Sequence, residues 1–363
     1  QPDDDNPHAR HPCSVADVAD LESIRPAFDG QDAAVDLLAI RGPTDAPSES
    51  RWTTSATTLR RNRGNANAWE CDEVGHMNVR FHLAKAGEAM GLMSQMIAMR
   101  GAFRRGATAT LAARELTVRF LAEARPGAPL AVRGGVIDHD ATSLTCALIL
   151  EHCAIGKPAA AFTVRLEHAD PVTGAVFPFA RRTLAALDAL RVNKPAECET
   201  RSLSHDAPQI LSPTRADALG LERVSRGMIN PDETDAFGRL RLEFTFGKIS
   251  NAVIHLESGF PEQWAAYREG RDLTAASAVL EARLIYRRFP RPGDDYVLRS
   301  GISHVNKNVR TLVHWVCDSE TGEGLWSMEA VGCLMDLQTR KLKPVDPDTL
   351  AMMESHVIEG LKP

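Results

Sequence analysis

Residues 69–79 read WECDEVGHMNV, and a long apolar run from Val79 to about Met99 follows them. Asp72 lies three positions before Gly75, which predicts a carboxylate at the end of an extended segment and then a tight turn. The apolar run predicts a helix that is buried on nearly all sides. A helix start offers unpaired backbone N–H groups and a positive dipole end. A carboxylate that faces such a start could activate water or attack a carbonyl, and the N–H groups of the helix start could hold the resulting oxyanion.

The composition is that of an ordinary globular protein, with 44% hydrophobic and 25% charged residues. A length of 363 residues favours two domains. The formal net charge of -6 argues against a nucleic-acid partner, which would need a basic face. No apolar run approaches the ~20 residues of a membrane span, so we expect none.

The seven cysteines are odd in number and show no Cys-x-x-Cys spacing. We therefore expect neither a disulfide framework nor a cysteine-bound zinc ion, and we expect a cytoplasmic location. The twelve histidines show no His-Glu-x-x-His or other metal-binding spacing, so no metal site is expected.

The elements expected after the motif form an α+β layer. A helix is expected over 79–100. Four strands rich in Val, Leu, Thr and Phe are then expected at 108–121, 130–138, 143–152 and 159–169. One buried helix followed by a meander of long strands is typical of a curved antiparallel sheet wrapped around a helix.

The chain repeats itself. The segment at 125–127, Arg-Pro-Gly, recurs at 291–293, an offset of 166. Upstream the offset is 163, because Asp72 corresponds to Asp235 and Gly75 to Gly238. Two constant offsets over more than a hundred residues predict two fused copies of one domain, and their difference predicts a three-residue insertion in the helix region of the second copy.

This repeat divides the chain into five parts. The first 50 residues are rich in Asp, Pro, Ala and Ser, so we expect a partly disordered extension with a short helix near 15–24. The expected parts are the extension at 1–50, the first domain at 51–190, a linker at 191–215, the second domain at 216–346 and a C-terminal helix at 347–363.

The motif resembles that of the hot-dog fold, in particular the 4-hydroxybenzoyl-CoA thioesterase-like acyl-CoA thioesterases. That family's motif reads roughly Asp-x-x-Gly-His-Val-Asn-Asn before the central helix. Met77 replaces the valine and Val79 the second asparagine. Plant acyl-carrier-protein thioesterases are similar too, with Val74 here in place of their intervening asparagine. The matching residues are Asp72, Gly75, His76 and Asn78.

The resemblance implies two fused hot-dog domains that hydrolyse an acyl-CoA, or an acyl-carrier-protein thioester, with no cofactor besides the CoA of the substrate. The fused pair could stand alone or form a homodimer.

Each motif residue has a functional interpretation and a structural one. Asp72 would act as general base or as nucleophile, and the sequence does not separate the two. His76 would polarise the carbonyl or orient Asp72, or it is a buried structural histidine. Asn78 would belong to the catalytic group, although it is also well placed as a helix N-cap, the interpretation that we slightly favour. Glu88 lies where the family often carries a glutamate, although a solvated or paired side chain is the simpler interpretation. The backbone donors of the oxyanion hole would come from Gly75, Met77 and Val79.

The second copy keeps the acid and the glycine at Asp235 and Gly238, but arginines replace the histidine and the asparagine, at Arg239 and Arg241. The two sites should therefore differ. Our hypothesis is that the first site is catalytic and the second is degenerate or has turned to binding.

Three weaker signals concern the substrate. Methionines at 90, 93, 96 and 99 could line an acyl tunnel, although such a stripe is more often core. Arg104 with Arg105, and Lys307 with Arg310, are basic pairs near expected loops that could hold the CoA phosphates, although such pairs are usually solvated.

Two rival functions remain open. Enoyl-CoA hydratases of the hot-dog fold carry a histidine five positions after the aspartate, whereas His76 follows Asp72 by four, which favours the thioesterase. A non-catalytic acyl-CoA-binding module is the other rival, because the second copy has lost the histidine and the asparagine.

Overall fold

The structure is a computed structural model in which residues 62–363 are described. The described residues all belong to one compact unit. The extension expected at 1–50 and its helix near 15–24 lie outside the described residues, as do residues 51–61 of the expected first domain. Among the helices described, none is both long and apolar enough to cross a membrane.

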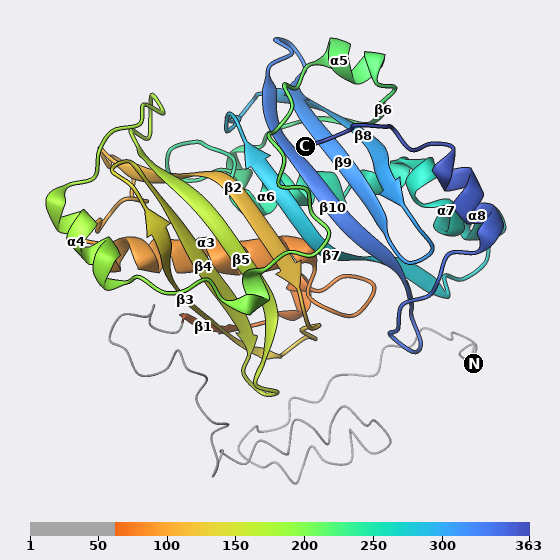
Figure 1. The fold of residues 1–363 in the computed structure, drawn as a ribbon, viewed down its shortest axis with the longest axis horizontal. Coiled ribbons are helices and arrows are strands. Elements are labelled where there is room, and N and C mark those ends of the chain that lie inside the picture. Colours follow the sequence, from red (N-terminus) through yellow and green to blue (C-terminus); the bar gives the residue numbers. More distant parts are fainter. Residues whose placement is uncertain (1–61) are drawn as a thin grey trace, which may run out of the picture. The chain divides into compact units, whose positions relative to one another are not determined.

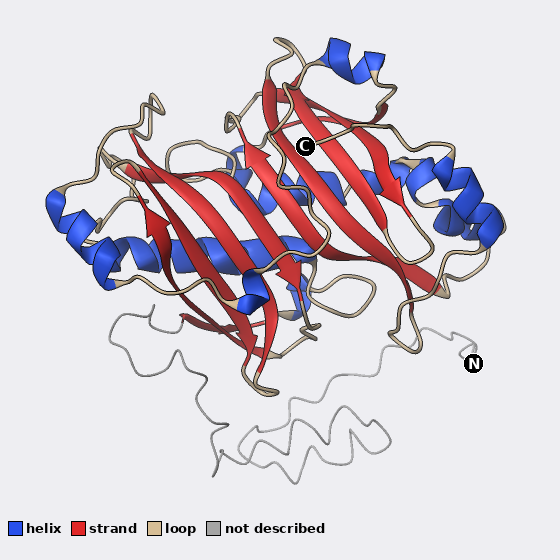
Figure 2. Cartoon of the chain, in the orientation of Figure 1, coloured by secondary structure: helices blue, strands red, loops and turns tan. Residues whose placement is uncertain are grey.

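A ten-stranded antiparallel sheet runs through both halves, with the helices α3 and α6 on one side of it (Figures 1 and 2). Neighbouring strands follow the same order outward from the centre in each half. In the first half this order is β2 (Thr110–Phe120), β5 (Lys157–Ala169), β4 (Ser143–His152), β3 (Pro129–His139) and β1 (Asn62–Asn65). In the second half it is β7 (Ala275–Tyr286), β10 (Gly324–Asp336), β9 (Arg310–Asp318), β8 (Asp295–Val305) and β6 (Glu222–Met228).

The two halves join where β2 pairs with β7, about a centre at which Thr117 lies opposite Arg283. Two ion pairs cross this seam, with Arg119 Nε 3.2 Å from a Glu281 oxygen and Arg283 Nε 2.7 Å from a Glu115 oxygen. Arg119, Glu281 and Arg283 are buried, so each charge depends on its partner across the seam.

The segment between the halves crosses the face of the sheet opposite the helices (Figure 1). Its backbone N–H groups at Arg201 and Ser202 donate to the Glu281 carboxylate, and its carbonyl at Ser204 accepts from Arg283. The segment therefore satisfies the buried charges of the seam, although its sequence indicates only a polar linker.

The central helices differ in length. α3 (Val79–Met96) is continuous over 18 residues, whereas α6 (Leu242–Ser250) ends after nine. The offset of 163 aligns Val79 with Leu242, so both helices begin at matching positions. The three-residue insertion falls after Ser250, where two short 3-10 turns and then α7 (Pro261–Arg268) replace the rest of the helix. A proline at Pro261 cannot continue a helix but begins one well.

Several element ends differ from expectation. The first central helix ends at Met96 and not near Arg100, because Ala98 adopts a left-handed conformation with φ of 61°. The C-terminal helix, expected at 347–363, ends at Glu354. The remaining elements are η2 (Ala68–Glu70), α4 (Arg181–Ala189), η3 (Ala196–Cys198), α5 (Pro213–Ala218), η4 (Pro231–Glu233), η5 (Val253–His255), η6 (Glu257–Gly259) and α8 (Pro347–Glu354).

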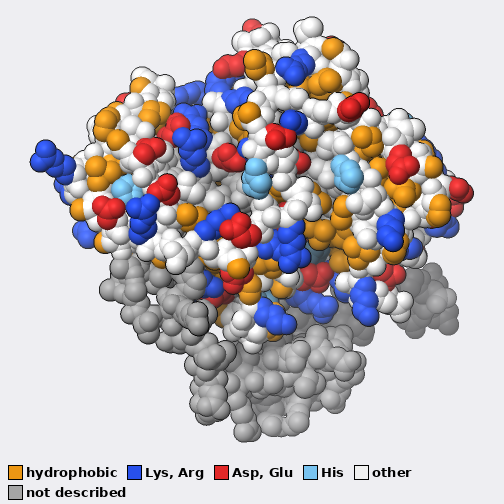
Figure 3. Space-filling view, viewed as in Figure 1, with side chains coloured by type: hydrophobic (Ala, Val, Ile, Leu, Met, Phe, Trp, Pro, Cys, Tyr) orange, Lys and Arg blue, Asp and Glu red, His pale blue; other side chains and the backbone are white. Residues whose placement is uncertain are grey.

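The core lies between the helices and the sheet. From α3, Leu83, Ala86 and Met93 are buried against the sheet, where Leu148 and Phe162 are fully buried. Burial of one such side chain stabilises the fold by about 1.5–3 kcal/mol. Acidic, basic and apolar side chains are interspersed on the outer face (Figure 3).

Candidate active site

A capped turn carries the motif into α3. Asn67 is the N-cap of η2, and its N–H donates to Glu70 Oε2 at 2.9 Å. The other oxygen of Glu70 accepts from Lys85 of α3 at 2.8 Å. The second half repeats this pair, because Lys248 contacts Glu233 at 2.6 Å at the same offset. This pair ties the turn to the helix in both halves.

The turn places the Asp72 carboxylate beside the start of α3. The Gly75 N–H donates to the Asp72 carbonyl at 3.0 Å, and the Asp72 N–H donates to the His76 carbonyl at 3.1 Å. Gly75 has φ of 82°, a conformation that strains any residue with a side chain. The predicted glycine turn is therefore present.

Asn78 serves both the helix and the carboxylate. Its Oδ1 accepts from the Arg80 N–H at 3.0 Å, which makes it the N-cap of α3. Its Nδ2 donates to Asp72 Oδ2 at 3.2 Å. The structural and functional interpretations of this residue therefore do not exclude each other, because one amide orients the acid while it caps the helix.

His76 lies beside the same carboxylate, with Nδ1 3.4 Å from Asp72 Oδ1. This is an ion-pair distance without the geometry of a hydrogen bond, and Nδ1 has no hydrogen-bond partner among the described residues. Both side chains are about one-fifth exposed, so a substrate can reach them.

The carboxyl of Asp72 is held in its ionised form. Partial burial alone would raise its pKa, but the neighbouring His76 and the donors from Val74 and Asn78 outweigh this, so the pKa lies below its usual value. An ionised and partly exposed carboxylate at a helix start can take a proton from water or attack a carbonyl carbon.

Two of the three expected oxyanion donors are already engaged. The Gly75 N–H donates within the turn, and the Met77 N–H donates to the Ala124 carbonyl at 2.7 Å. We therefore correct the expectation for Gly75 and Met77. The N–H groups of His76 and Val79 donate no hydrogen bond to any described residue, and they remain available to an oxyanion.

Sequence reasoning missed His82, which lies one turn into α3 and is 4% exposed. Its Nδ1 is 3.3 Å from the Asn78 carbonyl, and its ring meets Phe120 edge-on at 5.2 Å. Burial lowers the pKa of His82 to about 4, so it is neutral. A histidine on an apolar helix face gives no signal except its spacing of four from Asn78.

The second motif has the same fold, but hydrogen bonds within the motif occupy both oxygens of its carboxylate, Asp235. Asp235 Oδ2 accepts from Arg239 Nε and Nη2 at 2.9 and 2.8 Å, and Oδ1 accepts from the N–H groups of Phe237 and Arg239. In the first motif the N–H of His76, at the position of Arg239, is open. Arg241 pairs with Glu243 at 3.1 Å. The Asp235 carboxylate therefore has no free oxygen lone pair of good geometry for a substrate.

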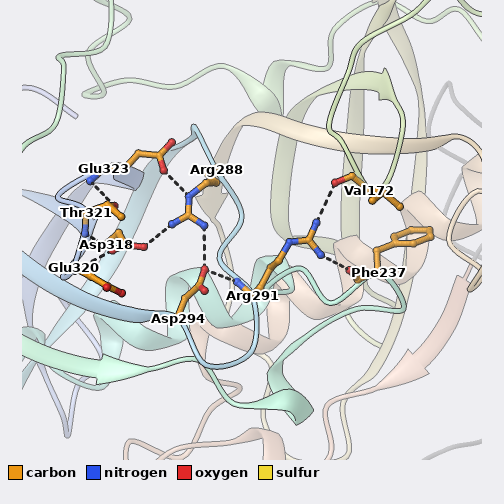
Figure 4. A network of polar contacts seen from close by, with 9 residues as sticks. All are labelled: Val172, Phe237, Arg288, Arg291, Asp294, Asp318, Glu320, Thr321 and Glu323. Carbon is orange, nitrogen blue, oxygen red and sulfur yellow. Dashed lines mark hydrogen bonds and ion pairs between the residues drawn. The ribbon is translucent and has the colours of Figure 1, made fainter.

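Each motif turn is bridged to the other half by a guanidinium. Arg291 donates to the Phe237 carbonyl at 3.2 Å and to the Val172 carbonyl of the first half at 3.1 Å (Figure 4). In the first motif Arg340 of the second half donates to the Val74 carbonyl at 3.4 Å. The carbonyls of Val74 and Phe237 occupy matching positions, so different arginines fulfil one role.

The remaining candidates lie away from Asp72. Glu88 is exposed on α3 and faces a small hollow beside β1 and β3. Arg104 and Arg105 are exposed in the loop after α3. The expectation for Arg310 is wrong, because it is 2% exposed and pairs with Glu262 at 2.8 Å. Of the four methionines, those at 90 and 93 are core residues.

The region at 62–363 contains no group of three or more His, Cys, Asp or Glu residues that could hold a metal ion. Cys71 is not an activated thiol, because burial and the neighbouring carboxylates of Asp72 and Glu70 raise its pKa.

Comparison with known proteins identifies the family and the fold of this chain. Residues 66–187 and 229–353 match the thioesterase-like superfamily. An acyl-ACP thioesterase from Bacteroides thetaiotaomicron VPI-5482 superposes with a TM-score of 0.56 at 12% identity, over 76% of this chain and 98% of that one. A 12:0-ACP thioesterase from Umbellularia californica gives 0.59 at 10% identity, over 79% and 98%. No curated protein matches in sequence. These likenesses confirm the α+β fold of two fused hot-dog domains.

Proposed function

Because the chain belongs to the thioesterase-like superfamily, we propose that its Asp72 site hydrolyses an acyl thioester to a free acid and a thiol. The observation that carries this proposal is the contrast between the two motifs. Asp72 is ionised, partly exposed and beside open N–H groups, whereas Asp235 is saturated by Arg239.

The proposed chemistry assigns a task to each group. The Asp72 carboxylate takes a proton from the attacking water, or attacks the carbonyl carbon to give a mixed anhydride that water then cleaves. The N–H groups of His76 and Val79 stabilise the oxyanion, a contribution of about 3–4 kcal/mol per donor in such sites. The His76 side chain polarises the carbonyl, and Asn78 fixes the carboxylate orientation.

The proposed substrate is an acyl-CoA, with an acyl-carrier-protein thioester as the alternative carrier. Two solved proteins that share the fold are named as thioesterases of acyl-ACP, and this favours testing both carriers. The reaction as proposed needs no cofactor besides the thiol carrier of the substrate, and we propose a cytoplasmic location. A homodimer of the fused pair is compatible with the proposal but not required by it.

The test is thiol release across a panel of acyl-CoA and acyl-carrier-protein substrates, with Asp72→Asn as the inactive control. We expect release by the wild-type chain and loss of about 10²–10⁴-fold in the variant. Binding of acyl-CoA without thiol release would favour the non-catalytic module. Hydration of crotonyl-CoA without thiol release would favour the hydratase.

A further inference from the structure

A cavity of about 520 Å³ lies at the far end of α3 from Asp72. The loop after α3, the end of β5 and the start of α4 form its walls. At 1.5 Å per residue the 18 residues of α3 separate it from the motif by about 27 Å. Its volume falls within the range of small-molecule sites. Apolar side chains that line it include Met99, Ala102, Phe177 and Pro178.

The cavity is basic in a chain of net charge -6. The stretches 98–114 and 171–187, which contribute most of its walls, contain no Asp or Glu. Arg100 and Arg182 line it, are exposed, and form no ion pair with any described residue. Two guanidinium groups without a carboxylate partner favour an anionic ligand.

The repeat shows what is missing at the start of α4. In the second half the matching helix, α8, has Asp346 as its N-cap, and the Thr349 N–H donates to that carboxylate at 2.9 Å. At the offset of 166 the first half has Ala180 and Thr183 in these positions. Ala180 provides no side-chain cap, and α4 has no acidic residue in its first turn. The start of α4 in the first half therefore lacks the carboxylate that caps α8 in the second half.

The Thr183 N–H, which matches the Thr349 N–H, donates to the Ala180 carbonyl at 2.8 Å, but other donors at the start of α4 are open. Thr183 lines the cavity and is 3% exposed, and its hydroxyl forms no hydrogen bond with the described residues. The N–H groups of Arg181 and Arg182 at the start of α4 also have no acceptor there. An uncapped helix start with open N–H groups, the hydroxyl of the buried residue Thr183 and two guanidinium groups is a cradle for an anion.

His168 limits which anion fits. It lines the cavity, is 7% exposed, and its Nδ1 lies 2.9 Å from the Phe177 carbonyl, so Nδ1 carries the proton. The ring stacks on Phe179 at 4.7 Å and adds a flat surface to the cavity wall. The combination of a basic rim with apolar walls suits a carboxylate that carries a short hydrocarbon body.

We propose that this cavity is a binding site for a small aliphatic carboxylate, whose head group binds at the start of α4, where Ala180 leaves open the position that the Asp346 side chain fills at the start of α8. The site is separate from Asp72, and the proposal stands whether or not the chain hydrolyses thioesters.

Calorimetry on the full chain tests the site with hexanoate, 1-hexanol and inorganic phosphate as probes. Hexanoate should bind once per chain and more tightly than either of the others. Ala180→Asp supplies the missing carboxylate from the chain itself, so it should weaken hexanoate binding about tenfold or more. Arg100→Gln combined with Arg182→Gln should do the same. Arg63→Gln, an exposed arginine on β1, is the matched control and should bind as wild type does.

Each other outcome overturns the proposal. Phosphate that binds more tightly than hexanoate would show a phosphate site, and hexanol that binds equally would show an apolar pocket. Hexanoate binding that Ala180→Asp leaves unchanged but Asp72→Asn removes would place the ligand at the motif. Thermal unfolding of Ala180→Asp, expected at or above the wild-type temperature, shows that the variant is folded.

Discussion

Arg340 of the second half donates two hydrogen bonds to the carboxylate of Glu123 in the first half, 217 residues earlier in the chain. Arg340 has φ of 57°, and the matching residue of the first half is Gly174, with φ of 73°. A side chain in this conformation costs about 1–3 kcal/mol. The second half thus keeps a strained arginine where a glycine would be relaxed, and that arginine holds the turn that carries Asp72.

The variant Arg340→Gly should distinguish an effect of Arg340 on catalysis from an effect on stability. The glycine relieves strain but removes the donors to Glu123 and to the Val74 carbonyl. We expect kcat for thiol release to fall about tenfold with little change in KM, and the unfolding temperature to stay level or rise. Arg340→Lys, which keeps the charge but loses the planar fork, should recover part of the activity. An Arg340→Gly variant with wild-type kcat would show that the arginine only joins the halves.

The low pKa of Asp72 predicts the acid limb of the pH–rate profile. Because the carboxylate must be ionised to act, kcat/KM should stay constant until the pH falls below 3.8, the usual pKa of an aspartate side chain. Asn78→Ala removes one donor to the ionised form and should move this limb to higher pH. Brief assays with return to neutral pH distinguish titration from unfolding, and a wild-type limb near neutrality would contradict the assignment.

Two buried neutral histidines should make stability depend on pH. Burial lowers the pKa of His82 to about 4 and that of His314 to about 3, so the unfolded chain takes up these protons before the folded one does. Stability is therefore complete above the unfolded pKa and falls as the pH drops below it, by ~2 kcal/mol per histidine down to pH 5. Urea unfolding at pH 7 and pH 5 measures the loss. His82→Gln should reduce it, whereas the exposed His205→Gln should not.

Asp235 should matter for stability. Asp235→Ala leaves Arg239, whose side chain is 14% exposed, without its bidentate partner. We expect a loss of about 1–3 kcal/mol in urea unfolding. Asp232→Ala, an exposed acid in the same stretch, is the control and should lie within about 0.5 kcal/mol of wild type. Equal stability of the two variants would show that the pair contributes nothing.

The sequence predicted what depends on local chemistry. The glycine turn and the Asn78 cap follow from residue types at short spacing, the repeat follows from constant offsets along the chain, and the structure has each of them. The end of α3 escaped prediction, because Ala98 adopts a conformation that its side chain does not indicate.

What depends on contacts between distant residues could not be predicted. Arg310 was expected at a surface turn, but its side chain is buried and forms an ion pair with Glu262 of another element. The saturation of Asp235 by Arg239 became clear only from the hydrogen bonds, although the substitution itself is visible in the sequence. The bond between Arg340 and Glu123 has no sequence signal at all.

The most direct measurement compares kcat/KM for thiol release in Asp72→Asn and Asp235→Asn on one acyl-CoA. Both substitutions preserve shape and remove one charge at matching positions of the repeat. We predict a loss of about 10²–10⁴-fold for Asp72→Asn and a change within about twofold for Asp235→Asn. Full turnover in Asp72→Asn, or an equal loss in both variants, would contradict the account.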